Sequence, residues 1–142
     1  MKKYYKYTVA DHTFAVSLPG GYAQEDCLAP YLPFIAEGDP APLFRLTMDF
    51  ADTLDEVNPG KLCICLNEEA PYFWIFERPE GGYNFGFSYS KNNPDCIVVT
   101  SGDLKDSTVY VPASAGRPLV EFALNNALML LYTFNTTPYD TL

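Results

Sequence analysis

Basic residues are scarce in this sequence. Nine Lys and Arg stand against eighteen Asp and Glu among 142 residues, which gives a formal net charge of −9 and a pI near 4.3. An acidic surface repels nucleic acid and anionic membrane surfaces, so we expect neither as a partner. No apolar run approaches the roughly 18 residues of a membrane span, and the polar segment Tyr4-Tyr5-Lys6-Tyr7 stands where a signal peptide would be apolar. These features predict a cytoplasmic protein.

Cysteine and histidine are also scarce. Four unevenly spaced cysteines are too few for a secreted disulfide scaffold, and His12 is the only histidine. Cys63 and Cys65 would share one face of a strand and could form half of a thiolate metal site. A second cysteine pair or further histidines would be needed to complete such a site, so we expect no metal and no cofactor.

The sequence lacks a complete catalytic motif. Gly60-Lys61 is a Gly-Lys pair, but a phosphate-binding loop needs Ser or Thr where Leu62 stands and Gly where Asp55 stands. The acidic residues between 49 and 56 alternate with apolar ones and lack the close spacing of a calcium loop, which favours a solvated acidic loop. We therefore expect no catalytic residue, and an enzyme is the least supported class.

Alternating apolar residues predict eight strands. Glycine, proline and asparagine clusters separate them, and Pro30 and Pro33 limit 22–36 to one or two helical turns. The segment 72–78 is apolar on both faces, which predicts a central strand. The predicted strands cover residues 3–9, 12–18, 43–50, 62–66, 72–78, 83–90, 96–100 and 108–111.

The C-terminal segment has helical periodicity. Pro118 suits a first helical turn, and no Gly or Pro interrupts 119–132. An apolar stripe, widened by three further apolar residues, predicts a helix that is buried on most of its circumference and covers the sheet. The stripe comprises Val120, Leu124, Ala127, Leu128 and Leu131, and Phe122, Met129 and Leu130 widen it. The predicted fold is α+β: one domain, 1–142, with a mostly antiparallel β-sheet meander covered by one long C-terminal helix.

Aromatic residues are abundant: eleven Tyr, ten Phe and one Trp. They could fill the core of a sheet through cross-strand pairs. They could instead form an exposed platform that binds a peptide, a sugar or another domain, with Tyr4 and Tyr72 as candidates.

Three segments carry a resemblance to a known family. They are Pro118–Tyr132 with Thr136–Leu142, the N-terminal Tyr7–Phe14, and Ala41-Pro42-Leu43-Phe44. They resemble bacterial proteins related to HPr kinase, often described as phosphoenolpyruvate-carboxykinase-like. In that family a β-rich N-terminal region leads through such a helix towards a P-loop. The resemblance implies that this chain is a non-catalytic N-terminal accessory domain of a longer P-loop protein, and it carries no active-site residue onto this sequence.

This hypothesis predicts an interdomain surface near the C-terminal end. Tyr132, Phe134, Tyr139 and Leu142 would be covered by the next domain, and the isolated fragment would then tend to self-associate. They could equally fold back and close this domain's own core. The alternative function is a free-standing binding module that uses surface aromatics.

Overall fold

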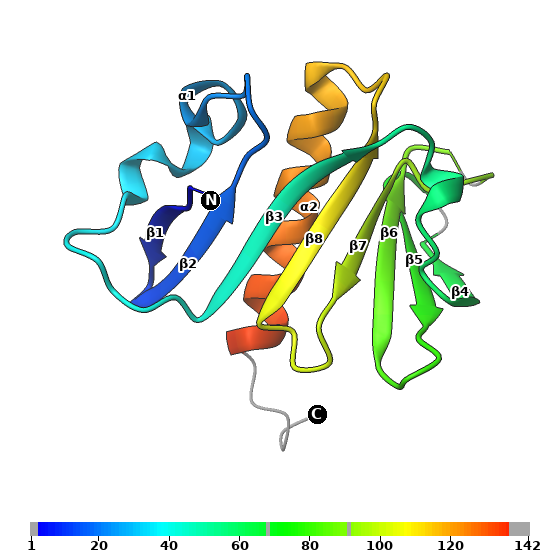
Figure 1. The fold of residues 1–142 in the computed structure, drawn as a ribbon. Coiled ribbons are helices and arrows are strands. Elements are labelled where there is room, and N and C mark those ends of the chain that lie inside the picture. Colours follow the sequence, from blue (N-terminus) through cyan, green and yellow to red (C-terminus); the bar gives the residue numbers. More distant parts are fainter. Residues whose placement is uncertain (1–2, 68, 91, 137–142) are drawn as a thin grey trace.

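The computed structural model describes residues 3–67, 69–90 and 92–136 and has the predicted α+β fold. Eight strands form one sheet, and the long helix α2 (Arg117–Thr136) crosses one of its faces (Figure 1). All eight predicted strands are present, with ends shifted by a few residues. They are β1 (Tyr5–Val9), β2 (His12–Ser17), β3 (Phe44–Ala51), β4 (Lys61–Leu66), β5 (Tyr72–Glu77), β6 (Tyr83–Ser88), β7 (Cys96–Thr100) and β8 (Asp106–Pro112).

The strand order is β1-β2-β3-β8-β7-β6-β5-β4, and the sheet is mostly antiparallel. Strands β4 to β8 form a five-stranded meander, whereas β3 lies between β2 and β8 and pairs parallel with both. Parallel neighbours need a long crossover connection. Between β2 and β3 this connection contains the short helix α1 (Gln24–Cys27) and the 3₁₀ helix η1 (Ala29–Phe34), as the prolines predict.

The core lies between α2 and the sheet. The predicted stripe of α2 is confirmed: its five residues are buried, and Ala123 joins them. The expectation that the helix is buried on most of its circumference is wrong, because Met129 is 67% exposed and several other α2 residues are only partly buried. The helix packs chiefly against β3 and β8, and Figure 1 shows β4, β5 and β6 to one side of it.

Strand β5 pairs with a strand on each side, β4 and β6, but it is second from the sheet edge rather than in the middle of the sheet. Trp74 and Phe76 on this strand are nevertheless buried. They line a cleft on the face away from α2 together with Leu54, Val57 and Pro59, from the connection that contains the 3₁₀ helix η2 (Leu54–Glu56). This connection supplies the apolar neighbours that explain the sequence of β5. No helix within the described ranges is long and apolar enough to cross a membrane.

Candidate interaction surface

An apolar groove runs between the C-terminal half of α2 and strands β5 and β6. It has a volume of about 280 Å³. Phe73 and Phe87 contribute from the sheet, and Met129, Leu130 and Phe134 contribute from the helix. An α-helix is about 10–12 Å wide and strands lie about 4.8 Å apart, so one helix covers only two or three strands. The groove therefore lies where the sheet extends beyond its helical cover.

Stacked aromatic rings fix the shape of this groove. The ring centroid of Phe73 lies 5.2 Å from that of Phe87 and 5.6 Å from that of Phe85, in stacked geometry. Phe134 stacks on Phe85 at 5.8 Å and so connects the last turns of α2 to the sheet. Such contacts hold the rings in place without a ligand, and the groove is preformed.

The amides at the groove rim are engaged within the chain. Asn67 donates its Nδ2 hydrogen to the carbonyl of Pro71 at 2.9 Å, and Asn126 donates to the carbonyl of Phe122 at 2.8 Å. Both residues line the groove. The groove consequently offers chiefly apolar contact, which suits an apolar side chain better than a charged or sugar ligand.

The residues predicted for an interdomain surface do not all gather here. Phe134 lines the groove, but Tyr132 contacts the β1–β2 hairpin, where its hydroxyl bonds the carbonyl of Val9 and its ring packs edge-on against His12. Tyr132 thus closes this domain's own core, as the alternative interpretation expected. Tyr139 and Leu142 lie outside the described residues.

The two candidate platform tyrosines lie apart from the groove. The Tyr4 hydroxyl is 3.5 Å from Oγ1 of Thr47, on the sheet face away from α2, and Arg45 lies over the Tyr4 ring at 6.0 Å. Tyr72 is half-buried and pairs with Ser88 across β5 and β6. Among the tyrosines that the structure describes, the most exposed are instead Tyr83 and Tyr89, at the ends of the alternating run 83–90.

Sequence reasoning missed Met129 and the apolar residues of β4 as surface features. Periodicity placed Met129 inside the widened stripe, and the short apolar strand β4 was not recognised as a sheet edge. A geometric argument could have indicated that Met129 is exposed. Only one side of a helix can face a sheet, and a stripe of eight residues is wider than that side.

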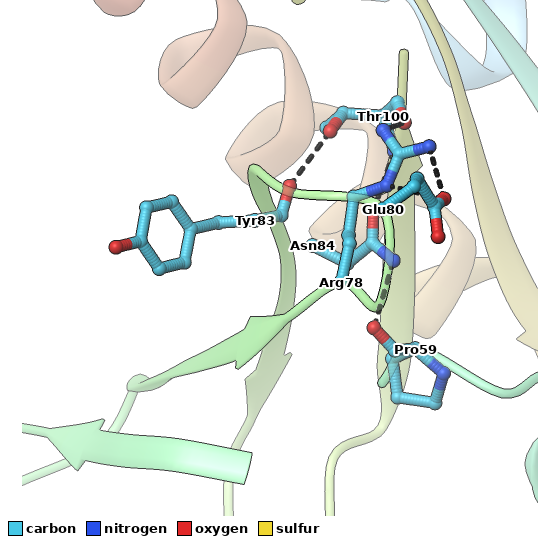
Figure 2. A network of polar contacts seen from close by, with 6 residues as sticks. All are labelled: Pro59, Arg78, Glu80, Tyr83, Asn84 and Thr100. Carbon is cyan, nitrogen blue, oxygen red and sulfur yellow. Dashed lines mark hydrogen bonds and ion pairs between the residues drawn. The ribbon is translucent and has the colours of Figure 1, made fainter. Parts of the chain in front are cut away.

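A buried polar network joins the β5–β6 turn to β7 and to the connection before β4 (Figure 2). The Asn84 side chain donates to the carbonyl of Pro59 at 2.8 Å and accepts from the backbone N–H of Thr100 at 2.9 Å. Thr100 donates its hydroxyl hydrogen to the carbonyl of Tyr83 at 2.7 Å, whereas the Tyr83 ring points away from the network. These groups satisfy one another, so the network is structural.

Arg78 completes this network at its outer end. Its guanidinium donates to the Thr100 carbonyl and pairs with Glu80, with 2.6 Å between Nη2 and Oε1. The Arg78 hydrogen bonds lower the pKa of the exposed Glu80 carboxyl. The ion pair lies within the β5–β6 turn, and the bond to Thr100 connects this turn to β7.

Shifted pKa values elsewhere have structural causes. Burial raises the pKa values of Tyr7 and Tyr31. The Tyr7 hydroxyl donates to Gln24 at 2.7 Å, and the Tyr31 hydroxyl donates to Asn125 at 3.2 Å. Burial also raises the pKa of Cys96 to about 12.

Cys63 lies at a bulge between Leu62 and Ile64, which interrupts the strand alternation assumed for Cys63 and Cys65. Among the described residues, no group of three or more His, Cys, Asp or Glu side chains could hold a metal ion.

Comparison of the chain with protein-family models, with curated proteins and with solved structures found no match in any of the three.

Proposed function

We propose that this chain is a non-catalytic accessory domain that packs against a P-loop kinase-like domain of the same protein. The observation that carries the packing is the preformed apolar groove beside the last turns of α2. The kind of partner comes from the family resemblance of the segments around α2 and the N-terminal hairpin.

The position of the groove suits a domain joined after α2. Met129, Leu130, Thr133 and Phe134 all line it and all lie within the last eight residues of the helix. A domain connected to this end would have a high effective concentration at the groove without any added affinity. An apolar side chain from that domain would cover Met129 and occupy the space above Phe73 and Phe87.

The first test is the encoding reading frame. The proposal expects it to continue beyond Leu142 into a glycine-rich Gly-Lys-Ser/Thr loop. A stop codon directly after Leu142 would overturn the proposal and favour the free-standing binding module.

The second test compares methionine oxidation in the longer protein and in the 142-residue chain. Met129 should be oxidised rapidly by hydrogen peroxide in the 142-residue chain and slowly in the longer protein, because the second domain covers it. Met48 is buried in both and serves as the internal control. Equal oxidation rates for Met129 in the two proteins would contradict docking at the groove.

A further inference from the structure

Strand β4 forms one end of the sheet, and among the described residues it pairs only with β5. A strand in this position presents a row of backbone N–H and C=O groups to any chain that can lie alongside it. Soluble proteins usually protect such an edge with charged residues or proline. Lys61 is the only charged residue of β4, and the strand contains no proline.

Three large apolar side chains of β4 are exposed. Leu62 is 49% exposed, Ile64 47% and Leu66 38%. Ile64 pairs with Ile75 and Leu66 with Phe73, which places both on the sheet face that carries α2 but beyond the cover of the helix. A strand added to β4 would bury these side chains and satisfy the edge backbone in one step.

The charges around β4 favour a second copy of this chain as the added strand. Lys61 begins the strand, and the exposed Glu69 lies beyond its other end. Antiparallel pairing of two identical strands brings the start of each beside the end of the other, so Lys61 of each copy would lie near Glu69 of the other. The interface is self-complementary, as a two-fold dimer requires.

The bulge at Cys63 selects the register of this pairing. The regular part of β4 beyond the bulge is the segment 64–66, and its centre is Cys65. A two-fold axis at Cys65 places Ile64 opposite Leu66 of the second copy on the α2 side. It also places the two Cys65 side chains directly opposite each other on the other side.

We propose that two copies of this chain pair antiparallel along β4, with the two-fold axis at Cys65, to form one continuous sheet. This association uses the strand edge rather than the α2 groove and does not depend on the proposed P-loop partner. The charge of −9 on each copy opposes association at low salt, so the dimer requires an ionic strength that screens long-range repulsion.

Cysteine cross-linking tests the register. Directly opposite residues of antiparallel strands have Cβ atoms about 4.5–5.5 Å apart, close to the separation that a disulfide needs. The oxidant diamide should therefore convert the two Cys65 thiols to a disulfide and be reduced to its hydrazine. The wild-type chain and Cys63→Ser should both give a covalent dimer on a non-reducing gel, and Cys65→Ser should give none. A covalent dimer that persists in Cys65→Ser, or is lost in Cys63→Ser, would overturn this register.

Sedimentation equilibrium tests the interface without oxidation. Ile64→Lys should raise the dimer dissociation constant at least about tenfold, because it places a charge in each half of a paired apolar edge. The control is Met129→Lys, which changes an even more exposed apolar residue, in the groove rather than on the strand edge, and should leave the dissociation constant unchanged. Thermal melts monitored by circular dichroism check that both variants fold. A wild-type chain that stays monomeric at all attainable concentrations, or a dimer that responds to Met129→Lys alone, would overturn the proposal.

Discussion

The hydroxyl of Tyr132 donates a hydrogen bond to the backbone carbonyl of Val9 at 3.0 Å, between residues 123 positions apart. The Tyr132 ring also packs edge-on against Phe14, which is buried and pairs with Tyr7 in the β1–β2 hairpin. This contact fastens the end of α2 to the first hairpin of the chain. It gives Tyr132 a role within this domain that its place near the end of an apolar helix did not reveal.

Removing this hydroxyl should reduce stability modestly. Tyr132→Phe keeps the ring contacts but leaves the Val9 carbonyl without its partner, so the free energy of unfolding should fall by about 0.5–1.5 kcal/mol. Urea denaturation measures the change. Tyr83→Phe alters an exposed tyrosine and should stay within about 0.5 kcal/mol. Equal effects of the two variants would show that the bond to Val9 adds no net stability.

The stripe of α2 predicts that truncating two neighbouring residues has very different effects on the free energy of unfolding. Leu128→Ala removes a side chain that is 2% exposed, and it should lower the free energy of unfolding by about 2–5 kcal/mol. Met129→Ala truncates a residue of similar size on the exposed side and should change it by about 0.5 kcal/mol or less. Thermal or urea unfolding of both variants provides the measurement. Similar losses for both would mean that Met129 is also covered in solution.

The backbone conformation at position 60 and the atoms packed around it both require glycine. Its φ is +110°, and a Cβ there would lie 2.1 Å from the backbone oxygen of Glu77. Gly60→Ala should cost at least about 1–3 kcal/mol from backbone strain, with the clash in addition. Gly20 has no positive φ and open space around it, so Gly20→Ala is the matched control and should be close to neutral. A stable Gly60→Ala variant would contradict the close approach of the two segments.

The buried amide of Asn84 should be sensitive to truncation. Asn84→Ala leaves the Thr100 N–H and the Pro59 carbonyl without their partner. The free energy of unfolding should fall by about 1–3 kcal/mol for each of these groups that stays buried. Asn92→Ala, at an exposed position, should fall within about 0.5 kcal/mol of the wild type. Chemical denaturation distinguishes the two. If Asn84→Ala unfolds like Asn92→Ala, water must replace the amide in the network.

The four cysteines should fall into two classes of reactivity. At about pH 8 and at a protein concentration low enough to keep the chain monomeric, Cys63 and Cys65 should react quickly with a thiol reagent. Cys27 and Cys96 are buried, and burial raises the pKa of Cys96 to about 12, so thiolate formation and access are both suppressed. Timed labelling with mass spectrometry should find two labels in the folded chain and four in urea. Early labelling of Cys96 would contradict its position in the core.

The sequence was sufficient to locate every strand and the long helix. Alternation in segments such as 43–50 and 83–90 follows from side chains pointing to opposite faces of a strand, which is a local property of the backbone. The position of β3 between β2 and β8 could not be read in this way, because periodicity contains no information about which strand lies alongside. The burial of β5 was predicted, but its cause was not: the connection that contains η2 covers it, so it does not need a central position.

Two features of the surface depended on the tertiary structure alone. The stripe on α2 was present in the sequence, but the exposure of Met129 was decided by the limited width of one helix over eight strands. In the same way, the apolar residues of β4 predicted a strand, but only the strand order of the folded sheet places that strand at an edge. Local backbone chemistry fixes which residues share a face. Whether another element covers that face depends on contacts between residues far apart in the chain, and these contacts created both the groove and the open edge.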